Sequence, residues 1–520
     1  MLLHEVVLDT ARDSPERVAL IFANRALTFG ELADRVRRTA SLVAGLAVPG
    51  GRIAVVGANH PGWVELYYGV PASGRTLVFL NHRLSGFELN ALLSRSGASA
   101  VIGDPVHLER LRSAGATVEL IDWERWESER DRIDESESEL ESDLDPAIDA
   151  AVDRSEMPAW LLFTSGTTAA PKGALLTHRS ILAAVAASTA ARPVDSDDVY
   201  AFPFPLCHVA GYNVVHRHAH GRPVVLLDRF DPIDFCESVK ANGATSTSLA
   251  ATMLASLLDH LDTHPDAIDD LRSLRSVAYG AAPMPPVLLR RTASLLGVDF
   301  AQGYGMTELS GNAVFLDAEA HREGLAGNPA ILSAAGKPAA GVELRITDDA
   351  DVDVEPGEIG EILVRAAQVM LGYLDDEEAT DAALRGGWLH TGDVGRIDAA
   401  GYLHVVDRSK DIIITGGENV SSREVEDVLS SFPGVSRVAV VGVPDPKWGE
   451  NVCAVIVPSA GETPDPGELV SYARTTLAGF KIPRHVVFVD ELPINASGKV
   501  LKAELRAWLA TRADGAGPRL

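Results

Sequence analysis

The sequence is poor in cysteine and has no long apolar run, and both absences exclude classes of protein. Its three cysteines, Cys207, Cys236 and Cys453, lie far apart, so they form neither a disulfide framework nor the spacing of a cysteine-ligated metal site. A reducing, cytoplasmic location is therefore expected. No apolar run approaches the roughly 18 residues that a membrane-spanning helix needs. The first residues also lack the basic region and apolar core of a signal peptide.

Positive charge is scarce as well. The chain has 46 lysines and arginines against 73 aspartates and glutamates, which gives a formal net charge of −27 at pH 7. Nucleic acids and anionic membranes bind basic patches, so this balance argues against both as partners. It does not argue against a small anionic ligand, because a local cradle of donors can be positive on an acidic protein.

The length and the patterning predict a multidomain α/β protein. At 520 residues the chain is too long for one core, and about two to four domains are expected. Strand and helix patterns alternate over 1–120 and 154–400, which is typical of layered α/β structure. The acidic segment 127–145 indicates a solvated loop or mobile linker, or alternatively a partner-binding segment. Short strands between Gly and Asp turns over 359–407 predict a small β-barrel or meander.

Individual elements are also predicted. Strands are expected at 18–22 and 52–57, and a helix begins at Thr28, with threonine as N-cap and a glutamate three residues later. After Lys410 the pattern is that of a small α+β domain. We expect its helices at 422–431, 466–477 and 501–511, and its strands at 438–443, 452–457 and 486–489.

The run from Thr164 to Gly173, TSGTTAAPKG, carries the strongest chemical signal. Apolar segments on both sides predict a strand, a loop and a strand. Glycines allow the backbone to approach a ligand, and hydroxyl and N–H groups can form an anion cradle to which Lys172 adds a charge. The run lacks the GK[ST] of a Walker loop. The alternative is a Ser/Thr-rich surface turn.

This run resembles the phosphate-binding loop of the adenylate-forming superfamily, which includes acyl-CoA synthetases, luciferases and peptide-synthetase adenylation domains. The resemblance covers nearly the whole chain. It implies a large N-terminal domain over 1–409, a small mobile C-terminal lid domain over 410–520, and a hinge at Lys410. The residues that it assigns to ATP phosphates are Thr164, Ser165, Gly166, Thr167, Thr168 and Lys172.

A second motif, QGYGMTE, spans residues 302–308. An aromatic ring can stack on a planar base, and a carboxylate beside a triphosphate suits Mg²⁺. Family resemblance places Tyr304 against adenine, Thr307 near the α-phosphate and Glu308 on Mg²⁺. The alternative is a Gly-rich turn with a buried tyrosine. The preceding segment 279–285 implies adenine contacts by Gly280, Ala281 and Ala282.

Two further motifs complete the nucleotide site by resemblance. Asp393, in a TGD triplet, and Arg408, in DRSKD, grip the ribose, although isolated TGD triplets are common in turns. Lys499, in PINASGK, contacts the substrate carboxylate and the α-phosphate, because a mobile cation offsets the repulsion between two anions. Lys502 is the neighbour most easily confused with it.

The segment PLCHVAG, 205–211, resembles the acyl- and aryl-CoA ligase form of its motif, with His208 gating the acyl site. The aspartate-containing motif of amino-acid-activating relatives is absent. Residues implied to face CoA are Gly416, Gly417, Glu418 and Asn419. Ser421 and Ser422 depart from the family pattern there, and Ala169 departs in the phosphate loop. The implied acyl pocket comprises His208, Val209, Asn213, Leu249, Tyr279, Gly303 and Met306.

Three histidines, His216, His218 and His220, have no assigned role. They could bind a metal, although no acidic or cysteine partner is nearby in sequence. Because the helix that carries them borders the acyl pocket in relatives, we also hypothesise a partly polar pocket that favours a functionalised acid over a plain alkyl chain.

The sequence thus predicts an ATP- and Mg²⁺-dependent acyl-CoA ligase. It would form acyl-AMP and pyrophosphate, then transfer the acyl group to CoA. The alternatives are an acyl-AMP ligase that loads a carrier protein, a luciferase-like oxidative enzyme and a non-catalytic nucleotide-binding protein. The identity of the acid and the choice between monomer and homodimer stay open.

Overall fold

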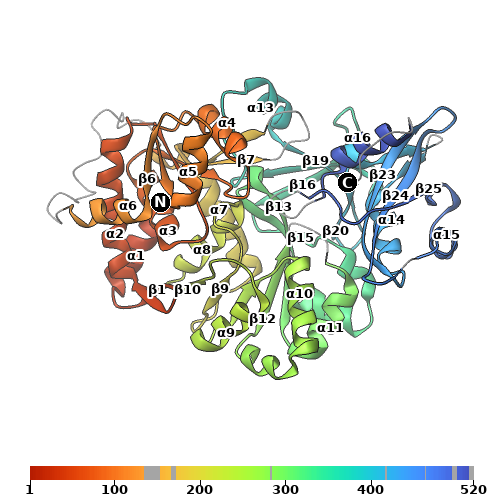
Figure 1. The fold of residues 1–520 in the computed structure, drawn as a ribbon, viewed down its shortest axis with the longest axis horizontal. Helices are drawn as coiled ribbons and strands as arrows, with labels where there is room; N and C mark the ends of the chain where they lie inside the picture. The colour runs from red at the N-terminus through yellow and green to blue at the C-terminus, as the bar shows by residue number, and fades with distance from the viewer. Residues whose placement is uncertain are drawn as a thin grey trace. The chain divides into compact units, whose positions relative to one another are not determined.

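The chain folds into two compact units in a computed structural model. The first unit comprises Met1–Leu344 and Val364–Leu389, and the second comprises Arg345–Leu363 and His390–Leu520. The structure describes residues 1–133, 153–164, 171–280, 284–415, 418–462, 464–494 and 500–513. Figure 1 shows the fold.

A seven-stranded sheet forms one layer of the first unit. Its neighbours β7, β4, β3, β5 and β6 are parallel, whereas β18 and β8 are antiparallel additions at one edge. In spatial order the strands are β18 (Gly372–Tyr373), β8 (Lys172–Thr177), β7 (Pro158–Thr164), β4 (Thr76–Leu80), β3 (Arg52–Val56), β5 (Ala100–Gly103) and β6 (Glu119–Asp122).

A nine-stranded sheet forms a second layer of the same unit. It is parallel from β1 to β13 and antiparallel at both edges. In spatial order the strands are β15 (Lys337–Pro338), β14 (Gly311–Leu316), β13 (Asp299–Met306), β12 (Ser276–Gly280), β11 (Ser246–Ser248), β9 (Tyr200–Phe202), β10 (Val224–Leu226), β1 (Val18–Phe22) and β2 (Arg25–Thr28). Strands buried in parallel sheets read as apolar runs, which is why β1, β3 and β4 stand out in the sequence.

Helices connect the strands and cover the sheets. The capping box predicted at Thr28 and Glu31 is confirmed, because each side chain bonds the other residue's backbone N–H at the start of α2. The helices of this unit are α1 (Glu5–Asp13), α2 (Phe29–Leu46), α3 (Pro61–Ala72), α4 (Gly86–Ser96), α5 (Pro105–Ser113), α6 (Trp123–Asp131), α7 (His178–Ala191), α8 (Tyr212–His218), α9 (Pro232–Asn242), α10 (Ala251–Thr263), α11 (Pro286–Leu296), α12 (Ala318–Ala326) and α13 (Glu377–Ala383).

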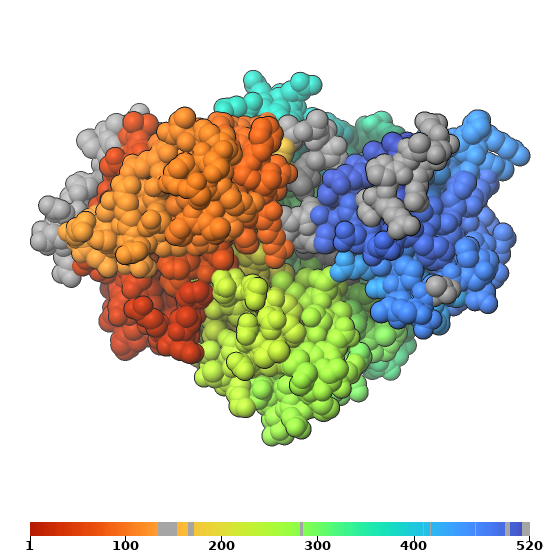
Figure 2. Space-filling model, viewed as in Figure 1, coloured from red at the N-terminus to blue at the C-terminus, as the bar shows by residue number. Residues whose placement is uncertain are grey.

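The core of the first unit joins its two sheets. Helix α3 is buried along nearly its whole length, and Trp63, Tyr67 and Tyr68 are fully buried. The ring of Tyr67 packs on Trp160 of β7, with centroids 4.7 Å apart. In the space-filling view the red-to-orange start of the chain adjoins the yellow-green region that contains α9 and α10 (Figure 2).

The second unit contains two further sheets. One has the order β16 (Val342–Thr347), β17 (Gly360–Ala366), β19 (Leu389–Ile397) and β20 (Leu403–Arg408). The other has the order β22 (Glu418–Val420), β21 (Ile413–Thr415), β24 (Gly449–Pro458) and β23 (Val435–Asp445), with β25 (His485–Phe488) also paired to β24. Its helices are α14 (Ser422–Leu429), α15 (Pro466–Arg474) and α16 (Lys502–Ala513).

Two sequence expectations about secondary structure need correction here. The strands expected to close as a small barrel form an open four-stranded sheet among the described residues, so the meander alternative is the right one. The acidic segment predicted as a loop over 127–145 begins inside α6, where Trp126 and Arg130 are buried on one helix face. The rest of that segment, from residue 134, lies outside the described residues. Each helix and strand expected after Lys410 is present within a few residues of its predicted bounds.

No helix among the described residues is both long and apolar enough to cross a membrane.

Buried histidines predict that acid destabilises the fold. His178 begins α7, accepts a hydrogen bond from the Leu3 N–H at 3.0 Å, and has its pKa lowered to about 3 by burial and, to a lesser extent, by His4. Below pH 6.5 the unfolded chain binds a proton that the folded chain does not, so unfolding free energy falls with pH by about 1.4 kcal/mol per unit and per such histidine.

The test is urea unfolding of wild type and His178→Asn at pH 5.0 and 7.5, because Asn keeps the acceptor but does not titrate. The wild-type loss between the two pH values should exceed the variant's by about 2 kcal/mol. An equal loss in both proteins would contradict the burial of a neutral His178.

Candidate active site

The phosphate-loop segment is the connection of a β-hairpin. Strands β7 and β8 are antiparallel, Thr164 pairs with Lys172, and the Thr164 hydroxyl donates to the Lys172 carbonyl at 3.3 Å. The two predicted strands on either side of the segment are therefore present. Four predicted phosphate ligands in the connection, Ser165, Gly166, Thr167 and Thr168, lie outside the described residues.

A tyrosine joins the predicted phosphate lysine to the predicted magnesium ligand. The Lys172 ammonium lies 5.0 Å from the centre of the Tyr373 ring, and the Tyr373 hydroxyl donates to Glu308 Oε1 at 2.9 Å. Strand β18 brings Tyr373 beside β8, and the Met370 N–H donates to the Glu308 carbonyl at 2.8 Å. The structure thus groups a cation and a carboxylate that are 136 positions apart in the chain. Sequence reasoning did not single out Tyr373, because a lone tyrosine after a glycine carries no signal.

Glu308 lies in a tight turn. It belongs to the short 3-10 turn Thr307–Leu309 between β13 and β14, and Ser310 follows in a left-handed conformation with φ of 54°. A side chain on Gly305 would lie 2.0 Å from the Gly311 carbonyl oxygen, so only glycine allows the two strands to approach there. Among the described residues Glu308 Oε2 has no partner, which leaves one carboxylate oxygen for a cation such as Mg²⁺.

Two of the predicted adenine-side residues lie on neighbouring strands. Tyr304 is half-buried on β13, and Gly280 ends β12, where a side chain would lie 2.5 Å from the Gly303 carbonyl oxygen. Ala281 and Ala282 lie outside the described residues. Tyr279 is buried, and its hydroxyl is 2.8 Å from Nε2 of His321. Burial raises the pKa of Tyr279, so the phenol stays protonated.

His208 carries an unpartnered ring nitrogen. It precedes the turn Val209–Gly211, and its Nε2 is buried without a hydrogen-bond partner among the described residues. Burial, with smaller effects from Arg83 and His82, lowers the pKa of His208 to about 4, so the ring is neutral at neutral pH. A buried polar atom without a partner is rare, and it fits a group that a bound carboxylate would contact.

The other predicted pocket positions lie on the first unit's second layer. Leu249 is buried after β11, Gly303 is buried within β13, and Met306 ends that strand. Val209 is half-buried in the turn before α8, and the Asn213 side chain accepts from Arg192 at 2.8 Å and donates to the Ala210 carbonyl.

The three unassigned histidines face different partners, so they do not form a metal site. His218 bonds the Tyr68 hydroxyl and the Ala19 carbonyl, whereas His220 bonds the Thr189 hydroxyl. Within the described ranges, the only group of three possible metal ligands comprises Asp351, Glu361 and His390, which lie elsewhere, in the second unit.

The second unit brings the two predicted ribose ligands together. Asp393 on β19 and Arg408 on β20 face each other in register, and Arg408 Nε lies 2.7 Å from Asp393 Oδ1. Asp393 is buried, whereas the Arg408 side chain is 37% exposed. The pair presents an acceptor and donors side by side, a combination that suits a vicinal diol such as ribose.

The segment around the predicted hinge is tied to two helices. Lys410 lies in the short turn Ser409–Asp411, and its carbonyl accepts from Arg506 of α16 at 3.3 Å. Buried Asp407 accepts from the Ser422 N–H and hydroxyl at 2.7 and 2.6 Å. The serines that depart from the family pattern therefore begin α14, since Ser421 also caps that helix by accepting from the Glu424 N–H.

Of the two C-terminal lysines, the structure describes only Lys502. Lys502 Nζ lies 2.8 Å from Glu426 Oε1 and donates to the Ser422 hydroxyl. Its positive charge is therefore paired with a carboxylate of the same unit. Lys499 lies outside the described residues. Of the predicted CoA-facing residues, Glu418 and Asn419 are exposed on β22, whereas Gly416 and Gly417 lie outside the described residues.

Comparison with known protein families shows which family this chain belongs to. The model of the AMP-binding enzyme family matches residues 7–374, and the model of the AMP-binding enzyme C-terminal domain matches residues 424–499. The chain belongs to the AMP-binding enzyme family.

Named relatives of this AMP-binding enzyme are ligases. It is 38% identical over 501 residues to a feruloyl-CoA synthase from Amycolatopsis, which covers 95% of this chain and 96% of the relative. It is 33% identical over 511 residues to the fatty acid–[acyl-carrier-protein] ligase ScoC from Streptomyces coeruleorubidus, covering 95% and 94%. Among solved structures, o-succinylbenzoate CoA synthetase from Bacillus subtilis with its acyl-adenylate intermediate superposes with a TM-score of 0.84, at 31% identity and 99% coverage of both chains.

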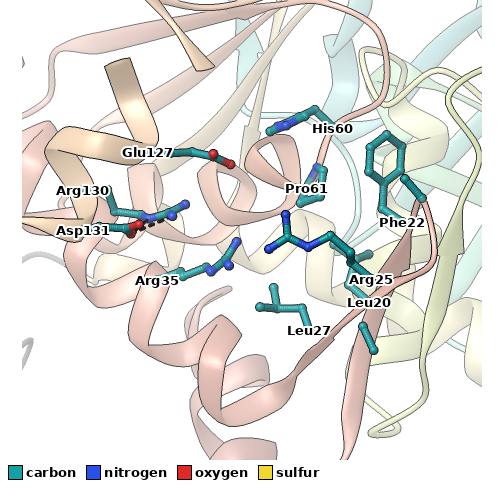
Figure 3. A pocket seen from close by; sticks show the side chains of 12 residues that line it. Leu20, Phe22, Arg25, Leu27, Arg35, His60, Pro61, Glu127, Arg130 and Asp131 are labelled. Atoms are coloured by element: carbon teal, nitrogen blue, oxygen red, sulfur yellow. Dashed lines mark hydrogen bonds and ion pairs between the residues drawn. The ribbon is translucent and has the colours of Figure 1, made fainter. Parts of the chain in front are cut away.

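The AMP-binding enzyme also has a cavity away from the predicted site residues. Figure 3 shows this pocket, of about 340 Å³, between the β1–β2 hairpin and helices α2, α3 and α6, with Arg25 and Arg35 directed into it. Buried Glu65 lies 2.9 Å from Arg35 and 2.5 Å from Arg130, and Arg130 also pairs with Asp131. The pocket contains none of the predicted ATP, acyl or CoA residues.

Proposed function

We propose that this AMP-binding enzyme joins a carboxylic acid to ATP, releasing pyrophosphate, and then transfers the acyl group from acyl-AMP to CoA, releasing AMP. The observation that carries the proposal is the grouping of Lys172, Tyr373 and Glu308 in a chain whose family membership is shown. The acids named for the relatives, ferulic and o-succinylbenzoic acid, carry a ring, so aromatic acids are the first substrates to test.

In the first half-reaction the acid's carboxylate attacks the α-phosphorus of ATP. Lys172 and the loop that precedes it hold the phosphates, and Thr307 stabilises the α-phosphate. Mg²⁺ on Glu308 would offset phosphate charge when bound. A neutral His208 orients the attacking carboxylate by a hydrogen bond, whereas an imidazolium would hold it as an ion pair and weaken it as a nucleophile.

The second half-reaction needs the C-terminal domain to present a different face. The proposal places the domain boundary between residues 409 and 410, with Lys410 as the hinge, Lys499 for adenylation, and residues 416–419 for CoA. A hinge absorbs its φ/ψ change at a few residues between elements, and the turn after β20 is such a position. A cytoplasmic location also belongs to the proposal.

A carrier protein is the second candidate acceptor. One relative is named for a fatty acid–[acyl-carrier-protein] ligase activity, at 33% identity over nearly the full chain. Free CoA and a carrier protein offer the same pantetheine thiol, so the chemistry of the two reactions is the same and only the docking surface differs.

The test is mass spectrometry of products formed from ATP, Mg²⁺ and a panel of aromatic, aliphatic and polycyclic acids, with and without CoA. Acyl-CoA and AMP from at least one acid are expected. Acyl-AMP that accumulates despite CoA would favour the carrier-protein acceptor. No adenylate from any acid would contradict the proposed activation step.

A further inference from the structure

Arg192, the C-cap residue that follows α7, is a half-buried cation without a carboxylate partner among the described residues. Its terminal nitrogen donates to Asn213 Oδ1 at 2.8 Å, and its guanidinium lies 5.9 Å from the centre of the Phe315 ring. Its Nε–H is buried and has no acceptor in the described part of the chain. A charge in this setting normally costs stability unless a counter-charge or further hydrogen bonds compensate it.

His216 supplies a second unsatisfied donor. It is 0% exposed on α8, and Arg217 donates to its Nδ1 at 2.8 Å. Because Arg217 cannot accept, Nδ1 is the acceptor and the neutral ring carries its proton on Nε2. That Nε2 is also buried without a partner among the residues described. Burial, followed by Arg217 and Arg192, lowers the pKa of His216, which keeps the ring neutral.

Both donors lie where the acyl pocket is predicted. Asn213 and His216 are three residues apart, so they share one face of α8, and α7 packs beside α8 (Figure 1). Phe315, beneath Arg192, pairs in register with Gly303 of β13. Arg192 therefore contacts one residue assigned to the pocket, Asn213, and lies over Phe315, the strand partner of a second, Gly303.

We propose that Arg192 and His216 select acids that carry a second oxygen acceptor at the end remote from the reacting carboxyl group. Two buried N–H donors without acceptors require an oxygen, which a plain hydrocarbon lacks. Because Arg192 also lacks a counter-charge, a carboxylate satisfies it more fully than a ketone does. The inference rests on the proposed acid activation and adds the chemical class of its substrate.

The test uses two series of carboxylic acids, and within each series the acids have the same scaffold and differ in the group at the remote end. One series is 3-phenylpropanoate, 3-(4-acetylphenyl)propanoate and 3-(4-carboxyphenyl)propanoate, and the other is octanoate, 7-oxooctanoate and octanedioate. Pyrophosphate release measures kcat/KM for each acid. The wild-type enzyme should prefer an acceptor-bearing acid over its plain analogue by about tenfold or more in at least one series, since a charged hydrogen bond is gained.

Arg192→Met removes the cation but keeps the length of the side chain. It should lower kcat/KM for the acceptor-bearing acids by about 10- to 100-fold, mainly through KM, and change the plain acids by less than about twofold. Arg192→Lys should recover part of the loss for carboxylates only. Arg275→Met, which removes an exposed arginine paired with Asp197, is the matched control and should change neither class.

His216→Phe gives an independent variant if Arg192→Met does not fold, and it should show the same split between acceptor-bearing and plain acids. Equal wild-type rates for plain and acceptor-bearing acids, or equal losses for both classes in the variants, would overturn the inference while leaving the proposed function intact. Failure of every acid to release pyrophosphate would instead count against the proposed function.

Discussion

Replacing Lys499 by alanine should slow acyl-AMP formation by about 10²- to 10⁴-fold, whereas thioester formation from supplied acyl-AMP should change by less than about tenfold. The adenylation step brings a carboxylate against a triphosphate, and a cation at the reacting phosphorus offsets that repulsion. Transfer to a thiol proceeds from a mixed anhydride with one phosphate, so it needs that cation much less. The two half-reactions are measured separately, by pyrophosphate release and by acyl-CoA formation.

Lys502 provides the matched control for this prediction. Its ammonium pairs with Glu426 and bonds the Ser422 hydroxyl, so Lys502→Met leaves the half-buried Glu426 carboxyl without its counter-charge. We expect a lower melting temperature and equal effects on the two half-reactions. If Lys499→Ala also lowered both half-reactions equally, its assignment to the adenylation step would be wrong.

Glu308→Gln should lower the rate of pyrophosphate release by about 10²- to 10³-fold and raise the Mg²⁺ concentration needed for half-maximal rate by about tenfold. Glutamine keeps the size of the side chain, and its oxygen can still accept from the Tyr373 hydroxyl. The variant therefore removes the negative charge with little change in packing. The measurement is a Mg²⁺ titration of pyrophosphate release at saturating ATP and acid.

Tyr373→Phe tests how much the hydrogen bond that positions Glu308 contributes, apart from the negative charge of Glu308 itself. It removes the hydrogen bond to Glu308 but leaves the carboxylate and the ring beside Lys172 in place. The expected loss is smaller, up to about tenfold, with an unchanged Mg²⁺ requirement. An unchanged Mg²⁺ requirement in Glu308→Gln would show that this carboxylate does not hold the metal.

Most of the secondary structure could be predicted from the sequence, because the signals for helices and strands are local. The capping box at Thr28 and the apolar runs of β1 and β3 depend on neighbours within a few positions, and the structure has all three. The predicted barrel failed for the same reason, since strand patterns do not say whether the first and last strands of a sheet pair. The acidic run from 127 concealed the end of α6, because the one buried residue of the helix within that run, Arg130, is not apolar.

The sequence by itself determined the family, the order of the motifs and the residue types of the candidate site, because these lie in short contiguous segments. Only the tertiary structure decided which of them meet. Register across β19 and β20 pairs Asp393 with Arg408, and the edge strand β18 inserts Tyr373 between Lys172 and Glu308. The packing of α7 on α8 likewise places Arg192 on Asn213. Such contacts join distant segments through packing and strand pairing, and no local pattern encodes them.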